Sequence, residues 1–419
     1  MEDTMLTKRI LAALLCLSLL TAGALGMTGC SVRVQAADLM EGITPGSAAE
    51  KPADDAFKKN AADFAVRLFQ KTRDSEKNSL ISPLSVMLAL AMTANGAKGE
   101  TRAQMEQLLG GELEALNAYL YSYMHSLPSE QNAKLSLANS IWFRDQGFTA
   151  EKAFLQTNAD YYGAAAYKSP FDTQTVKDIN HWVKENTDGM IDKVLDTIDP
   201  ETMMYLINTV LFDAEWKEIY NKDSIYDGIF TALDGTRQTV SMMHSAEGLY
   251  LDDGKATGFI KEYANGYSFA ALLPKEDVTL ADYVSSLTGE GLLSTLEQAK
   301  RTHVVAAMPK FNYQYEIRMN DALKSLGMTL PFDGEAADFT AMGHADYGNL
   351  FIGSVIHKTN ITVDARGTKA GAVTAISMNT EMAEPETVSV TLNRPFVYVI
   401  LDNATNLPIF IGTVTNPVG

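Results

Sequence analysis

The sequence is short of cysteine and of positive charge, and each shortage excludes a class of protein. Only 2 of the 419 residues are cysteine, so disulfide bonds cannot form the framework of the fold and a packed core must stabilise it. The 34 lysines and arginines are outnumbered by 52 aspartates and glutamates, which gives a formal net charge of −18. We therefore expect no nucleic-acid partner and no electrostatic binding to an anionic membrane. With 46% hydrophobic and 21% charged residues, the chain is nevertheless globular.

The sequence motifs of common enzymes are also missing. There is no Gly-x-Ser-x-Gly, HExxH, Walker or GxGxxG motif. No two of the six histidines have the spacing of metal ligands; they are His125, His181, His244, His303, His344 and His357. The pair Asp252-Asp253 is interpreted as a solvated turn rather than a cation site. We expect no ordinary enzymatic activity, no metal and no cofactor.

The first 29 residues have the pattern of an export signal. Basic residues precede an apolar run from Ile10 to Leu20, which is too short for a stable membrane span. The sequence Met27-Thr28-Gly29-Cys30 resembles a bacterial lipobox, in which Cys30 would carry a lipid. The alternative is ordinary secretion with cleavage after Ala36. We predict a signal peptide over residues 1–29 and an extracellular or cell-surface protein, lipid-anchored to the outer face of the bacterial membrane.

The chain then changes from an aperiodic segment to helical patterns. Residues 30–56 are rich in Ala, Gly, Ser, Pro and Asp, which predicts a flexible tether. A helical period begins at Phe57, and a second helix is predicted to open at Ser82-Pro83, where Ser suits the N-cap and Pro the first turn. This second helix is apolar nearly all round, so we expect it to be buried. Thr101 with Gln104 resembles the capping box of a third helix.

Strand-like runs dominate the rest of the chain, although its length alone would suggest two or three domains. The runs cover residues 135–143, 205–212, 266–273, 302–308, 351–363, 388–392, 396–401 and 408–414. Helices gathered at the front and strands at the back predict an α+β fold with antiparallel sheets.

The segment between Val363 and Val388 is too long for a hairpin connection, yet its middle has strand chemistry. As a strand it would present small and then apolar residues on one face, namely Thr368, Ala370, Ala372, Thr374, Ile376 and Met378. Two interpretations follow. Either the segment is a strand without a sequence neighbour that is able to enter a tight slot, or it is a plain edge strand or disordered loop.

At this segment the sequence resembles a serpin, and the resemblance extends from Phe57 to Pro417. The stretches that carry it occur in the family's order: Asn78 to Thr101, Leu206 to Tyr220, Val355 to Ala375, and Asn393 to Pro417. It implies a single domain over residues 57–419, with helices around three β-sheets and a reactive-centre loop exposed at one pole. It also implies a serine protease inhibitor, with a non-inhibitory binding or carrier protein as the alternative.

The family's mechanism gives the loop segment a role. A serine protease attacks the loop as a substrate, and the loop then inserts as a new strand into the central sheet, a known example of strand addition. Insertion requires a hinge of small, uncharged residues because they become buried. The positions that match the hinge are Gly367, Thr368, Ala370, Ala372 and Thr374. Their composition favours an inhibitor over the family's non-inhibitory members.

The resemblance also assigns residues to the slot that receives the loop. A polar cluster under the central sheet, the shutter, is matched by Ser82, Ser85, Asn208 and His357. Trp216 matches a residue at the breach, the point where the loop first enters the sheet.

The scissile bond is placed by counting from the hinge. The family's count gives Glu381–Met382, but the loop is about three residues longer than in well-known members, so Thr380 and Ala383 stay open as alternatives. Glu381 would suit a Glu-cleaving serine protease, and the other residues an elastase-like one. We expect the inhibitor to be a monomer.

Overall fold

The structure, a computed structural model, describes residues 34–128, 133–346, 348–368 and 387–418. The chain divides into two compact units, residues 1–35 and 36–419, and all the helices and strands given below belong to the second. Within the described ranges, no helix is both long enough and apolar enough to cross a bilayer.

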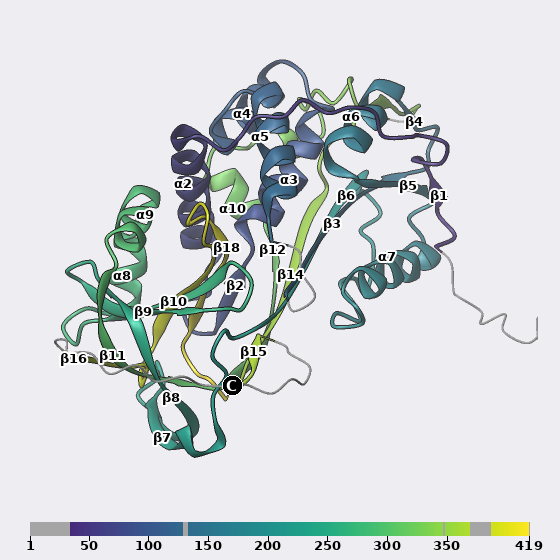
Figure 1. Cartoon of the computed structure of the whole chain (residues 1–419). Coiled ribbons are helices and arrows are strands. Elements are labelled where there is room, and N and C mark those ends of the chain that lie inside the picture. The colour runs from purple at the N-terminus through teal and green to yellow at the C-terminus, as the bar shows by residue number, and fades with distance from the viewer. Residues whose placement is uncertain (1–33, 129–132, 347, 369–386, 419) are drawn as a thin grey trace, which may run out of the picture. The chain divides into compact units, whose positions relative to one another are not determined.

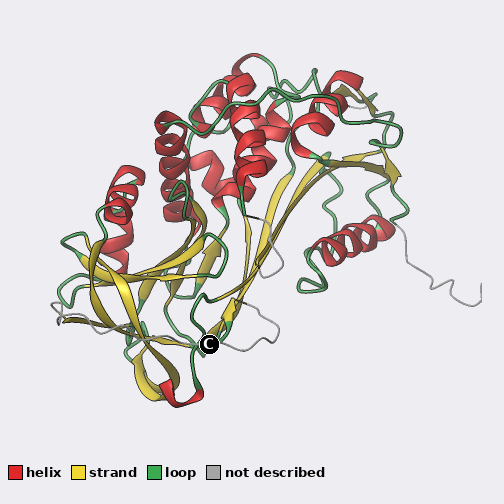
Figure 2. Cartoon of the chain, in the orientation of Figure 1, coloured by secondary structure: helices red, strands yellow, loops and turns green. Residues whose placement is uncertain are grey.

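Nine α-helices lie in the described part of the chain, and Figure 2 shows them in red. They are α2 (Asp55–Thr72), α3 (Pro83–Ala94), α4 (Gly99–Leu109), α5 (Leu113–Ser126), α6 (Lys152–Tyr162), α7 (Thr173–Asn186), α8 (Leu280–Ser286), α9 (Gly289–Glu297) and α10 (Asn320–Ser325). Helix α3 has the predicted start, since the Ser82 side chain accepts a hydrogen bond from the Ser85 N–H and Pro83 is its first residue. All 12 residues of α3 are buried, which confirms the expectation drawn from its apolar sequence.

The central sheet has seven strands in the order β1-β5-β3-β6-β15-β14-β12. Their bounds are β1 (Ala37–Asp38), β5 (Ala165–Ser169), β3 (Ala133–Arg144), β6 (Met204–Glu215), β15 (Gly367–Thr368), β14 (Ser354–Val363) and β12 (Phe311–Arg318). The short strand β15 lies between β6 and β14 at one end only. Farther along, β6 and β14 pair directly and in parallel, from Tyr205 with Ser354 to Thr209 with Lys358.

A second sheet has nine strands, and a third has two. The second consists of β16 (Thr387–Thr391), β11 (Lys300–Pro309), β8 (Arg237–Asp252), β9 (Ala256–Glu262), β10 (Tyr267–Pro274), β17 (Phe396–Asp402), β18 (Pro408–Val414) and β2 (Ser79–Ile81), with β7 (Ile225–Thr231) paired to β8. The third consists of β4 (Thr149–Ala150) and β13 (Gly343–His344). Each run predicted as a strand overlaps one of these strands, and the predicted α+β fold with helices around three sheets is confirmed. The expectation of antiparallel sheets is wrong in part, because β6 with β14, β3 with β5 and β11 with β16 pair in parallel.

Helices cover both faces of the central sheet. Figure 1 shows α3 on one side of β3 and β6 and α7 on the other side. Helix α3 contacts β3 and β6 as well as α2, α4 and α5. This position between a sheet and other helices explains why every side of α3 is apolar.

The segment before α2 differs from the flexible tether that its composition predicts. Strand β1 pairs antiparallel with β5, the edge strand of the rest of the sheet, and the Leu39 N–H continues the ladder to the Ala166 carbonyl at 2.9 Å. Farther along, the Gly46 N–H donates to Asp160 and the Lys51 N–H donates to the Ser122 hydroxyl at 2.7 Å. Residues 36–55 are therefore hydrogen-bonded to the domain, because an extended backbone can pair with an open edge whatever its side chains.

The predicted capping box at Thr101 is wrong. Helix α4 begins at Gly99, so Thr101 and Gln104 both lie inside it. The Thr101 hydroxyl accepts from the Asp338 N–H at 2.9 Å, and the Gln104 side chain accepts from the Leu330 N–H at 2.9 Å. Both side chains bind a distant loop instead of the helix start.

Candidate functional site

The predicted hinge begins where β14 ends. The chain turns at residues 364–366 and returns as β15, antiparallel to its neighbours. Gly367 pairs with Glu215 of β6, and Thr368 pairs with Ala214. The first two residues of the predicted hinge are therefore already a strand of the central sheet.

The turn before β15 depends on Asp364 and Gly367. The Arg366 N–H donates to the Asp364 carboxylate at 2.8 Å, and the Asp364 N–H donates to the Gly367 carbonyl at 3.0 Å. A Cβ atom on Gly367 would lie 2.1 Å from the Ala214 carbonyl oxygen. Only glycine allows β15 to approach β6 this closely.

Thr368 is buried beside Tyr263. Its side chain is 2% exposed, and its hydroxyl lies 2.7 Å from the Tyr263 hydroxyl. Tyr263 in turn stacks on Trp216, with the ring centroids 4.3 Å apart. Burial raises the pKa of the Tyr263 phenol, so this contact is between two neutral hydroxyl groups at physiological pH.

Trp216 and Tyr220 hold the turn itself. The Trp216 backbone N–H donates to the Arg366 carbonyl at 2.8 Å, and the indole N–H donates to the Asp364 carbonyl at 2.9 Å. The Tyr220 backbone N–H donates to the Ala365 carbonyl at 2.8 Å. Three successive carbonyls of the turn are thus bound by two residues that follow β6.

The four residues predicted for the shutter lie together in the structure. The Ser82 N–H donates to His357 Nε2 at 3.1 Å, and His357 Nδ1 lies 2.8 Å from the side-chain oxygen Oδ1 of Asn208. The Asn208 amide donates to the Ser85 carbonyl at 2.8 Å and to the Asn139 side chain at 2.5 Å. All five side chains are buried. Their functional role stays a prediction.

The hydrogen bonds fix the form of His357. Because Nε2 accepts a hydrogen bond from a backbone N–H, the ring proton must be on Nδ1, which then donates to Asn208. Burial lowers the pKa of His357 to about 3. The imidazole is therefore neutral at every physiological pH.

The cluster lies where β6 and β14 are joined. His357 and Asn208 are direct partners in the register of these two strands. Asn139 of β3 is the partner of Asn208 on the opposite side. Any separation of β6 from β14 below the hinge must break the hydrogen bond between His357 and Asn208.

Sequence reasoning missed Tyr220, Tyr263 and Asn139. Tyr220 lies at the end of the Leu206–Tyr220 stretch already matched to the family, so its position was visible but its backbone role was not. Asn139 is a polar residue in an otherwise strand-like run, which is a signal of a buried hydrogen bond. Tyr263 has no distinguishing pattern in the sequence.

Several predicted positions lie outside the described residues. They are Cys30 and the loop positions Ala370, Ala372, Thr374, Thr380, Glu381, Met382 and Ala383.

The pair Asp252-Asp253 is part of a turn. Asp252 forms an ion pair with Lys275 at 3.2 Å, and Asp253 accepts hydrogen bonds from the Ala256 N–H and the Tyr283 hydroxyl, both at 2.7 Å. Across the described ranges, no group of three or more His, Cys, Asp or Glu is placed to hold a metal ion.

Comparison with known proteins accounts for the hinge and the sheet together. A sequence model described as "Serpin (serine protease inhibitor)" matches residues 59–417. The chain belongs to the serpin family. Serpins are generally protease inhibitors and not enzymes.

Relatives of this serpin are widely distributed. It is 30% identical to Serpin-ZXA of Oryza sativa subsp. japonica, over 81% of this chain and 90% of that protein. It is 29% identical to a serine protease inhibitor of Cyanea capillata, over 82% of this chain and 93% of that protein.

The conformation of this serpin can be compared with two solved structures of the thermophilic serpin tengpin. The native state of tengpin is 52% identical and superposes with a TM-score of 0.88, over 91% of this chain and 100% of that chain. The latent state of tengpin superposes with a TM-score of 0.78, over 87% of this chain and 99% of that chain. This serpin is therefore closer in structure to the native state.

Proposed function

We propose that this serpin inhibits a serine protease as a suicide substrate. The protease serine attacks the carbonyl carbon of Glu381, or of a residue beside it, so an ester forms and the peptide bond breaks. The proton from the serine leaves with the new amino terminus. The freed loop then inserts into the central sheet between β6 and β14 and traps the ester before water hydrolyses it.

The observation that carries this proposal is the position of β15. Its two residues already form a strand antiparallel to both β6 and β14. A chain that continues from Thr368 in the same direction passes between these two strands. It meets the pairing of Asn208 with His357, which must open to let it through.

The sequence after Thr368 supports the same path. In a continuing strand, Ala370, Ala372 and Thr374 share the buried face of Thr368, and all three are small and uncharged. Small side chains fit between the sheet and its covering helices without overpacking.

Insertion of the loop as a strand can release enough free energy to trap the protease. A strand of about a dozen residues adds about ten ladder hydrogen bonds at roughly 0.5–1.5 kcal/mol net each. The sum is on the order of 10 kcal/mol, before the burial of side chains is counted. A gain of this size can hold a protease in a conformation that no longer hydrolyses its own ester.

We also propose which proteases this serpin inhibits and where the protein is located. A reactive bond at Glu381 suits a Glu-cleaving protease, and one at Thr380, Met382 or Ala383 suits an elastase-like protease. The N-terminal sequence supports export and a lipid on Cys30.

The experiment is to mix the protein with a panel of serine proteases and separate the products on denaturing gels. We expect a covalent band with at least one elastase-like or Glu-cleaving protease, and the N-terminus of the released peptide identifies the bond. The matched control is the same protease with its active-site serine blocked, which should give no band. Loop cleavage without a covalent band in every case would contradict inhibition and favour a binding or carrier protein.

A further inference from the structure

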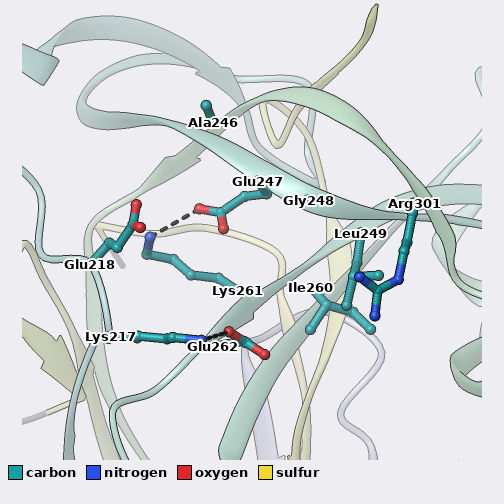
Figure 3. A pocket seen from close by; sticks show the side chains of 10 residues that line it. All are labelled: Lys217, Glu218, Ala246, Glu247, Gly248, Leu249, Ile260, Lys261, Glu262 and Arg301. Atoms are coloured by element: carbon teal, nitrogen blue, oxygen red, sulfur yellow. Dashed lines mark hydrogen bonds and ion pairs between the residues drawn. The ribbon is translucent and has the colours of Figure 1, made fainter. Parts of the chain in front are cut away.

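Two ion pairs lie side by side near the hinge, in the pocket drawn in Figure 3. Lys261 of β9 pairs with Glu247 of β8 at 2.9 Å, and their side chains are 3% and 11% exposed. Lys217 pairs with Glu262 at 2.5 Å, and their side chains are 61% and 45% exposed. The same pocket thus contains one buried and one exposed version of the same interaction.

The buried pair needs an explanation. Removing two charges from water is costly, and well-packed apolar residues in their place are often equally stable or more stable. Lys261 follows Phe259 on the same face of β9, where the pattern of the strand favours an apolar residue. Stability alone is therefore a weak reason for a lysine and a glutamate at these two positions.

The surroundings of Lys261 supply a reason. Its ammonium group lies 4.5 Å from the centre of the Tyr220 ring and 5.6 Å from the centre of the Trp216 ring. Both distances are within the range of cation–π attraction. Tyr220 and Trp216 are the two residues whose N–H groups bind the carbonyls of the turn before β15.

Glu247 fixes the ammonium group in this position. The Glu247 carboxylate accepts hydrogen bonds from Lys261 and from the Ser245 hydroxyl, the latter at 2.6 Å. The Ser245 hydroxyl also lies 3.3 Å from the Tyr220 hydroxyl. The Glu247 carboxylate thus orients the Lys261 ammonium group over the Tyr220 ring. It also orients the Ser245 hydroxyl, which lies beside the Tyr220 hydroxyl.

We propose that Lys261, held by Glu247, is a positioning residue for the hinge: its ammonium group keeps Tyr220 and Trp216 in the orientation that binds the turn at residues 364–366. The chain of contacts is continuous from Glu247 through Lys261 to Tyr220 and Trp216, and from these to the turn. The charge acts on the turn through these two aromatic residues.

A consequence for inhibition rests on the proposed function. If β15 is already held between β6 and β14, the cleaved loop can begin to insert at once. Insertion then competes better with hydrolysis of the ester. Loss of the cation is expected to move the partition towards cleaved, inactive inhibitor.

The test uses the full chain and four variants. Lys261→Met removes the cation and keeps a long apolar side chain, and Lys261→Arg keeps a cation. The double variant Lys261→Met/Glu247→Gln also removes the carboxylate that Lys261→Met leaves unpaired. Lys217→Met is the matched control, because it breaks the exposed pair in the same pocket.

The first measurement needs no protease. Hydrogen–deuterium exchange of the Trp216 and Tyr220 amides should be about fivefold faster in Lys261→Met, in keeping with a cation–π effect of roughly two- to thirtyfold on an equilibrium. Exchange should stay at the wild-type rate in Lys261→Arg and Lys217→Met.

The double variant separates positioning from stability. Its urea unfolding midpoint should return towards the wild-type value because no buried charge is left unpaired. Its hinge amides should still exchange about fivefold faster, because the cation is absent. If the double variant restores both the midpoint and slow exchange, or if Lys217→Met changes exchange as much as Lys261→Met, the proposal is overturned.

The second measurement is the number of inhibitor molecules consumed for each protease molecule trapped. The excess over one should rise about fivefold in Lys261→Met and in the double variant, matching the exchange result. An unchanged number with faster exchange would overturn the consequence for inhibition. A wild-type protein that forms no covalent complex would refute the proposed function instead, and the exchange measurement would still decide the positioning role.

Discussion

The substitution Thr368→Arg tests loop insertion at the first buried residue of the hinge. The part of β15 that the structure describes has two residues, so in the native state we expect the arginine to move out of the slot together with this strand. After insertion it cannot, because the following residues hold the strand between β6 and β14. The cost of burying the charge therefore falls on the inserted state.

The magnitude follows from the site. Thr368 is 2% exposed, and its hydroxyl is 2.7 Å from that of Tyr263, which offers no negative charge to an arginine. Burying an unpaired guanidinium there costs several kcal/mol. If about 2 kcal/mol of this cost is already present in the transition state for insertion, insertion slows about thirtyfold.

The assay is the ratio of covalent complex to cleaved inhibitor on a denaturing gel. We expect Thr368→Arg to lose nearly all of the complex while its loop is cleaved at the wild-type rate, because Glu381, where the scissile bond is proposed, lies 13 residues farther along the chain. Thr368→Ser, which keeps the hydroxyl, is the control and should resemble the wild type. Equal amounts of complex in Thr368→Arg and the wild type would refute insertion at this position.

Three further predictions concern single residues of the site. Burial lowers the pKa of His357 to about 3, whereas a histidine in the unfolded chain has a pKa of about 6.5. Between pH 7.5 and 5 this residue therefore gains a proton only in the unfolded state, and the free energy of unfolding should fall by about 2 kcal/mol. The fall in urea midpoint on acidification should therefore be larger in the wild type than in His357→Gln, and equal falls would count against this. Gly367→Ala places a Cβ 2.1 Å from the Ala214 carbonyl oxygen and should reduce the yield of complex on gels without slowing cleavage, whereas an undiminished yield would argue against the seated hinge. Trp216→Phe removes the indole N–H bond to Asp364 and should lower the free energy of unfolding by about 1 kcal/mol, and an unchanged midpoint would show that this bond contributes nothing.

Local sequence signals predicted the elements whose structure is decided by their own residues. The Ser82-Pro83 pair and the apolar run after it were sufficient for α3, because an N-cap and a first-turn proline act within a few residues. The strand at residues 408–414 was predicted with its bounds, since a continuous apolar run is typical of a strand buried on both faces.

The predictions that were wrong concern residues whose partners are distant in the sequence. Strand β1 forms because the edge of β5 is open, and nothing in the residues around Ala37 indicates this. Thr101 and Gln104 have the spacing of a capping box, but their side chains accept hydrogen bonds from the distant Asp338 and Leu330 N–H groups instead.

The site residues that could be predicted from the sequence are those in stretches that resemble the serpin family. The shutter residues came from matched stretches, and the structure brings them into one hydrogen-bonded cluster. The pairing of Lys261 with Glu247 joins two strands through their side chains, and a lysine in a strand does not reveal its partner in the sequence.

The most direct test of the central claim is the stability of the protein after its loop has been cut. The loop is cleaved by a protease that is not trapped, and the urea unfolding midpoints of the intact and cleaved proteins are compared. Insertion as a new strand should raise the free energy of unfolding by an amount on the order of 10 kcal/mol, so the cleaved protein should unfold at a much higher urea concentration. A cleaved protein that unfolds at the same concentration as the intact one would contradict insertion and, with it, the proposed mechanism of inhibition.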